Sequence, residues 1–136
     1  MSVDYFRTLI AVADDCPVEV SRVPQPRAGK PTAATLQYEM LAAHPGELTS
    51  QDVLFDSWLA RQPGDKPAAE VERLRKQFWS KPQACLRSSP LPKQFGFGLL
   101  FDQRGRITLV PRESDRYAAL LVDAEVTVRK ALRSRG

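Results

Sequence analysis

The stretch CLRSSPLPKQFGFGLLFD, Cys85 to Asp102, places a thiol, two hydroxyls and two cations within nine residues. A thiol can act as a nucleophile, whereas arginine, lysine and hydroxyl groups donate hydrogen bonds to an oxyanion. Pro90 and Pro92 fix the backbone between these groups and stiffen it. Three interpretations follow: a binding site, a catalytic site or a rigid turn with a purely structural role.

The cations and hydroxyls of this stretch suit the binding of a small anion or of an acidic partner surface. Arg87 can donate a planar pair of hydrogen bonds, and Ser88, Ser89 and Lys93 can add others. The structural alternative is that Arg87 pairs with an internal carboxylate while the serines cap turns. The sequence leaves both interpretations open.

Cys85 supports the alternative of a small cysteine-dependent enzyme or redox protein. Lys81 and Arg87 flank it without an acid, which favours the thiolate form of an exposed cysteine. A nucleophilic cysteine normally needs a base, and His44, the one histidine, stands at the end of a predicted helix. Cys16 is the second cysteine, and no metal-ligand spacing joins the two, so we expect reduced thiols, no metal and no cofactor.

Glycines and phenylalanines alternate after the prolines. In a strand, Phe95, Phe97, Leu99 and Phe101 share one face, while Gly96 and Gly98 share the other. A glycine inside a strand permits close approach of a ligand or of another backbone. We therefore include both glycines in the predicted binding site.

The two halves of the chain carry opposite charge. Residues 1–72 contain six cations and eleven acids, and residues 73–136 contain fourteen cations and five acids. The basic half favours an anionic partner such as phosphate, nucleic acid or an acidic protein, or pairing with the acidic half of the same chain. Non-specific nucleic-acid binding is thus a further alternative, and Lys81, Arg133 and Arg135 could add to the positive field.

The length of 136 residues fits one domain, 1–136, with its own core. No apolar run approaches the ~18 residues of a membrane span, so we expect no membrane partner. The N-terminal residues lack the basic start of a secretory signal, which predicts a cytoplasmic protein.

Hydrophobic periodicity predicts an α+β fold, a small and mainly antiparallel sheet covered by about three helices. Leu36, Met40 and Ala43 are the expected inward stripe of the first helix. Residues 125–134 fit strand and helix equally, and 81–94 read as a loop. The predicted elements are a strand at 4–13, helices at 31–44, 49–62 and 68–80, a hairpin at 95–110 and a short helix at 113–121.

The segments YFRTLIAVADDCPV, GKPTAATLQYEM, TSQDVLF, CLRSSPLPKQFGFG and ALRSR, in this order, resemble a family of small bacterial proteins catalogued as a domain of unknown function. The family's central motif typically reads QPCLRSSPLxKxYGWG. Phe95 and Phe97 replace its tyrosine and tryptophan, and Ala84 replaces its proline. The resemblance implies a compact bacterial cytoplasmic domain and marks 85–98 as its distinctive surface, with no known reaction or cofactor.

Overall fold

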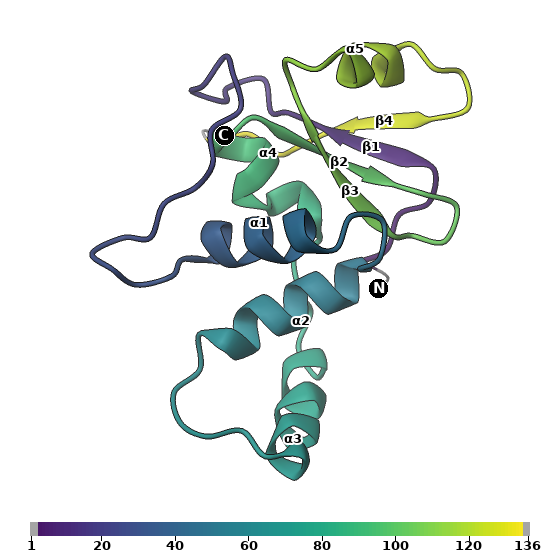
Figure 1. Ribbon diagram of the computed structural model, residues 1–136. Coiled ribbons are helices and arrows are strands. Elements are labelled where there is room, and N and C mark those ends of the chain that lie inside the picture. The colour runs from purple at the N-terminus through teal and green to yellow at the C-terminus, as the bar shows by residue number, and fades with distance from the viewer. Residues whose placement is uncertain (1–2, 135–136) are drawn as a thin grey trace.

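The fold is α+β, as the sequence predicts. A computed structural model describes residues 3–134, and Figure 1 shows a small sheet with helices on both of its faces. The elements are β1 (Thr8–Ala11), α1 (Ala33–Ala43), α2 (Ser50–Ala60), α3 (Ala68–Trp79), the 3-10 turn η1 (Leu86–Ser88), α4 (Pro90–Gln94), β2 (Phe97–Phe101), β3 (Ile107–Pro111), α5 (Asp115–Leu121) and β4 (Thr127–Lys130).

The sheet is mixed, so the expectation of a mainly antiparallel sheet is corrected. Its four strands lie in the order β3-β2-β1-β4, with β1 antiparallel to β2 but parallel to β4. The reason is the connection through α5, which crosses one face of the sheet and returns the chain in the direction of β3 (Figure 1). The ambiguous residues 125–134 therefore include a parallel edge strand.

The two faces of the sheet have separate apolar cores. Ile10 and Leu99 belong to the larger core, under α1, α2 and α4, and Leu9 belongs to the smaller core, with Leu120 of α5. The alternation of neighbouring residues between these cores is the two-residue period of a strand. The predicted shared face is confirmed for Phe97, Leu99 and Phe101, because all three lie in the larger core. Phe95 was wrongly included: it packs against the same core but is the C-cap of α4, before the strand begins.

Five α-helices are present in residues 3–134, two more than the number expected to cover the sheet. Both α1 and α2 begin with a capping box: the hydroxyl of Thr32 or Thr49 accepts from the backbone N–H three residues later, and the N–H of that threonine donates to the side chain of the same later residue. The short helix α4 was expected to be loop. It forms because Ser89 caps it and Pro90 occupies its first turn, where no N–H is needed.

The buried face of α1 differs from the predicted stripe. Ala34, Gln37 and Leu41 are buried, whereas Ala43 is exposed. Gln37 is polar and is not in the predicted stripe, but its amide oxygen accepts a buried hydrogen bond from Ser89. The helix is therefore rotated relative to the expected orientation.

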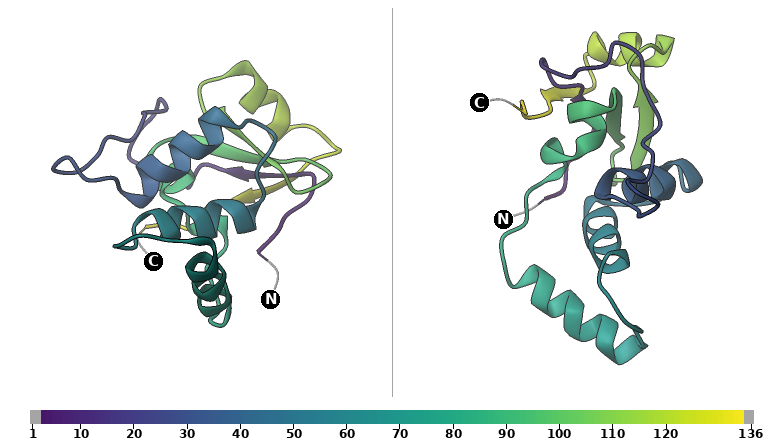
Figure 2. Two further views of the ribbon diagram at one scale, coloured as in Figure 1. Left: turned by 60° about the horizontal axis from the view of Figure 1, so that its bottom comes forward. Right: turned by 90° about the vertical axis from the view of Figure 1, so that its left-hand side faces the viewer.

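Helix α3 projects away from the sheet, as Figure 2 shows from two sides. Its C-terminal end is held by Phe78, whose ring lies 5.6 Å from that of Phe55 and 5.0 Å from that of Trp58. Arg75 covers the ring of Phe55 at 4.4 Å. Among the residues that the structure describes, no helix is long and apolar enough to cross a membrane.

Candidate functional site

The predicted loop is anchored by two leucines. Leu86 of η1 and Leu91 of α4 are 1% and 0% exposed and belong to the larger core. Burial of each side chain stabilises the fold by roughly 1.5–3 kcal/mol. The polar residues between them therefore sit on a fixed backbone.

Ser89 is part of this framework. It is 4% exposed, and its hydroxyl donates to Oε1 of Gln37 at 2.7 Å and accepts from the N–H of Leu91 at 3.2 Å. The hydroxyl thus both donates and accepts a hydrogen bond inside the protein, and the bond that it donates joins α4 to α1. The serine expected to contact an anion has a structural hydrogen-bond network instead.

Cys85 lies at the start of the same loop and contacts a residue far away in the sequence. Its Sγ is 3.1 Å from the hydroxyl of Tyr5, and the ring of Tyr5 packs against Phe101 with centroids 5.4 Å apart. Cys85 is partly exposed and is a free thiol, as is Cys16. The structure therefore brings together a thiol and a phenol at the edge of the larger core.

Burial is the main cause that raises the pKa of Tyr5 to about 12, and the contact with Cys85 adds to it. The guanidinium groups of Arg87 and Arg129 oppose this rise, because a nearby positive charge stabilises phenolate. The phenol therefore stays protonated at neutral pH. These two arginines are the positive charges that act on the Tyr5–Cys85 pair.

Arg87 covers the outer edge of β4. Its Nε donates to the carbonyl of Lys130 at 2.8 Å, and its own carbonyl accepts from the N–H of Leu132 at 2.9 Å. In residues 3–134 it forms no ion pair with a carboxylate. Arg87 is therefore held by the backbone and not by a carboxylate, contrary to the structural alternative raised by its sequence context.

Arg129 is a member of this group that the sequence analysis missed. It pairs in register with Ile10 across the β1–β4 ladder, which places it on the face of the sheet that carries the larger core. Once β4 is assigned as a strand, the two-residue period is the signal that could have found it. The ambiguity at 125–134 hid that signal.

Ser88 and Lys93 are partly exposed, and across the described chain neither side chain has an internal hydrogen bond or ion pair. Lys93 stands in the last turn of α4, where a cation is favoured by the helix dipole. Both side chains remain candidates for contact with a ligand.

The two glycines are approached closely by the chain itself. A Cβ at Gly96 would lie 3.1 Å from Cα of Ser21, and one at Gly98 would lie 2.9 Å from the ring of Tyr117. The N–H of Arg22 donates to the carbonyl of Phe95 at 2.9 Å, which draws the proline-rich segment, residues 17–31, onto Gly96. The close approach expected at these glycines is made by the segment near Ser21 and by α5.

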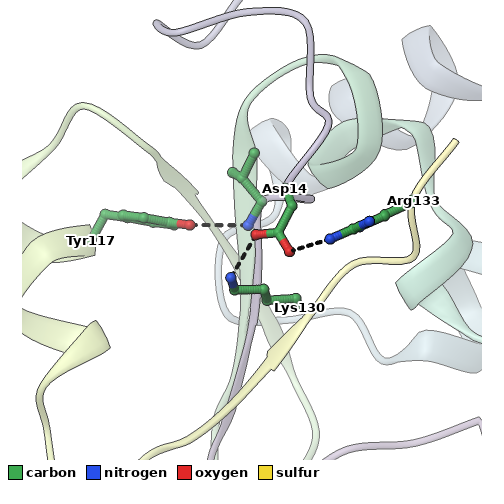
Figure 3. Close-up of polar contacts among 5 residues, drawn as sticks. Asp14, Tyr117, Lys130 and Arg133 are labelled. Atoms are coloured by element: carbon green, nitrogen blue, oxygen red, sulfur yellow. Dashed lines mark hydrogen bonds and ion pairs between the residues drawn. The ribbon is translucent and has the colours of Figure 1, made fainter. Parts of the chain in front are cut away.

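Part of the basic C-terminal half pairs with the acidic N-terminal half, as Figure 3 shows. Asp14 forms ion pairs with Lys130 and, at 3.4 Å, with Arg133, while the nearby Tyr117 hydroxyl accepts from the N–H of Val12 at 3.0 Å. The hydrogen bond from Lys130 lowers the pKa of Asp14. Arg135 lies outside the described residues.

A hollow with a volume of about 630 Å³ lies beside the end of α4. Gln94 and Phe95 line one side, and Val18 and Arg22 of the proline-rich segment line the other. This hollow was not foreseen, because it depends on where an irregular segment crosses the helix. In residues 3–134 no group of three or more histidine, cysteine or acidic side chains is placed to hold a metal ion.

Comparison with known proteins places the chain in a family. Neither the curated proteins nor the solved structures provide a match to the chain. A family model described as "Family of unknown function (DUF6157)" matches residues 1–136, the whole sequence. The chain therefore belongs to the DUF6157 family.

Proposed function

We propose that this protein is a non-enzymatic, single-domain binding protein of the bacterial cytoplasm. It holds a small anion, or the anionic group of a partner, at Arg87 and Arg129 beside Cys85 and Tyr5, and Ser88 and Lys93 add donors at the rim. Two unpaired thiols suit a reducing compartment.

The observation that carries the proposal is the charge around the Tyr5 hydroxyl. Arg87 and Arg129 both act on it, and neither forms an ion pair with a carboxylate within residues 3–134. Two guanidinium groups near the same partly buried phenol and thiol give this surface a positive potential. The Nε bond of Arg87 to a carbonyl fixes the guanidinium while its terminal nitrogens can serve a ligand.

The loop of this site is held in place by three further residues, Ser89, Gly96 and Gly98. Ser89 ties α4 to α1, and the glycines let the proline-rich segment and Tyr117 pack closely. Their contribution is to hold the loop that carries Arg87 in one conformation. A fixed donor loses little conformational entropy when an anion binds.

Titration with inorganic phosphate, followed by backbone and arginine side-chain NMR at low ionic strength, tests the proposal. The wild-type protein should show saturable shifts at Arg87 and Arg129, and Arg129→Gln should weaken phosphate binding about tenfold, because a charge-assisted hydrogen bond is lost. Arg116→Gln, on the exposed side of α5, is the matched control and should bind as the wild type does. Absence of saturable shifts, or equal losses in the two variants, contradicts the proposal.

A second function is supported by the 3.1 Å contact between Cys85 and Tyr5, since a phenol that donates to sulfur stabilises a thiolate. In this function Cys85 is a nucleophile or a redox thiol. Alkylation with iodoacetamide, in a Cys16→Ser background, measures its reactivity between pH 5 and 9. Reaction faster than that of free cysteine at pH 7 supports the function, and reaction at the same rate or slower rejects it.

A further inference from the structure

Phe6 presents an aromatic ring to solvent with unusual exposure. Its side chain is 58% exposed, the largest exposure of any aromatic residue in the described chain. The ring is not loose, because its edge rests on the hairpin turn: a Cβ at Gly105 would lie 3.2 Å from Cε1 of Phe6. Gly105, with φ at +77°, therefore both forms the turn and seats the ring.

The turn that supports Phe6 carries two arginines on a rigid backbone. Oδ1 of Asp102 accepts from the N–H groups of Arg104 and Arg106 at 2.8 and 3.0 Å, and the N–H of Gly105 donates to the Asp102 carbonyl at 3.1 Å. Both arginine side chains are exposed, and neither forms an ion pair in residues 3–134. Oδ1 of Asp102 is therefore engaged by backbone donors.

Arg7, the neighbour of Phe6, adds a third cation. Its φ is +47°, a left-handed conformation that costs a non-glycine residue energy. Two bonds hold it there: its N–H donates to the Asp102 carbonyl at 3.0 Å, and its carbonyl accepts from Thr127 at 2.9 Å. The kink interrupts strand alternation, so that Phe6 and Arg7 are both exposed, with Phe6 against Gly105 in the turn between β2 and β3.

An apolar hollow of about 460 Å³ lies next to these exposed side chains, and Arg7, Asp102 and Gln103 are part of its lining. Leu100, Leu120 and Val126 form its floor, and Gln103 and Glu125 stand at its rim. Two acids, Asp102 and Glu125, line the hollow and disfavour a phosphate inside it. A flat, uncharged ring with donor groups at its edge suits both the floor and the rim.

From this arrangement we propose that the surface formed by Phe6, Arg7, Arg104 and Arg106 binds single-stranded nucleic acid. An unpaired base stacks on the free face of Phe6, the arginines contact phosphates, and a neighbouring base enters the apolar hollow. An aromatic platform bordered by cations is the arrangement that proteins use for unpaired strands, whereas a duplex hides its base faces. The residues of this site differ from those of the anion site at Arg87, and neither proposal depends on the other.

Fluorescence anisotropy with a fluorescein-labelled 12-nucleotide oligothymidylate at 50 mM salt measures this binding. Phe6→Leu keeps an apolar side chain but removes the flat ring, and should weaken binding about tenfold. Arg104→Gln should weaken binding and reduce the slope of log affinity against log salt by about 0.7. Because all these side chains are exposed, the melting temperatures of the variants should equal that of the wild type.

Three comparisons decide the outcome. Arg61→Gln, which changes an exposed arginine at the C-cap of α2, should leave the affinity unchanged, and a duplex of equal length should bind more weakly. Thymidine monophosphate, but not inorganic phosphate, should compete at millimolar concentration. The proposal is overturned by absent binding at 50 mM salt, by Phe6→Leu binding as tightly as the wild type, or by a loss in Arg61→Gln equal to that in Arg104→Gln.

Discussion

The hydroxyl of Tyr5 lies 3.1 Å from Sγ of Cys85, although 80 positions separate the two residues along the chain. Tyr5 precedes β1, and its ring reaches into the larger core against Phe101. Cys85 begins the turn that carries Arg87 to the edge of β4. One contact thus joins the N-terminal segment, the central motif and the last strand.

The first prediction concerns the ionisation of Tyr5. Because burial and the contact with Cys85 raise its pKa to about 12, one of the three tyrosines should titrate near that value in an absorbance titration at 295 nm. Cys85→Ala removes the hydrogen bond and the thiolate charge but leaves the burial. The pKa of Tyr5 should therefore move part of the way back toward its ordinary value of 10.

The same shift fixes the sign of a pH effect on stability. The phenol is neutral in both states below pH 10, the unfolded chain ionises first above it, and the folded state keeps its proton until about pH 12. The free energy of unfolding should therefore fall between pH 10 and 12, and Tyr5→Phe should show a smaller fall. Identical pH profiles for the two proteins would contradict the assignment.

The second prediction concerns the buried pair Ser89 and Gln37. Ser89→Ala leaves the buried Oε1 of Gln37 without its hydrogen-bond donor. The free energy of unfolding, measured by urea denaturation, should therefore fall by about 1–3 kcal/mol. Gln37→Leu combined with Ser89→Ala removes both partners. The double variant should be more stable than the sum of the single losses predicts, and strict additivity would show that the two groups do not interact.

The sequence was informative where local chemistry and periodicity agree. The helix predicted at 49–62, the hairpin predicted at 95–110 and the aromatic face of β2 follow from rules that act over a few residues. The family resemblance was also confirmed, since the family model matches the whole chain. These features need no knowledge of distant contacts.

The features that were missed depend on distant contacts. Gln37 can be buried because its amide oxygen accepts a hydrogen bond from Ser89 of the central motif. Arg129 lies at the candidate site because β4 pairs in parallel with β1. The glycines of the central motif signalled a close approach, but their sequence could not say that Ser21 and Tyr117 make it. Tertiary partners decided the role of each of these residues.

The third prediction concerns the ion pairs of Asp14. Asp14→Asn removes the partner of Lys130 and Arg133, so the end of β4 should open more often. Amide exchange of Ala131, whose N–H donates to the Ala11 carbonyl at 2.8 Å, should become faster, while that of Leu99 in the sheet centre should not change.

Because the pKa of Asp14 is lowered, the stability of this end of β4 should also depend on pH. The ion pairs contribute stability above the unfolded pKa of 3.8 and lose it as pH falls through the lower folded value. Protection of Ala131 in the wild type should therefore decrease below pH 4, and in Asp14→Asn this decrease should be absent. Added salt should have the same effect as acid, because the pair is exposed and easily screened.

The last prediction concerns Gly98 and Tyr117. Gly98→Ala places a Cβ 2.9 Å from the tyrosine ring, which must shift and carry its hydroxyl away from the N–H of Val12. Overpacking of this kind should lower the free energy of unfolding by about 1–3 kcal/mol. Tyr117→Ala vacates the space that the new methyl group needs. Gly98→Ala should then cost much less in the Tyr117→Ala background than in the wild type, and an equal cost in both would mean that the ring is not what restricts this position.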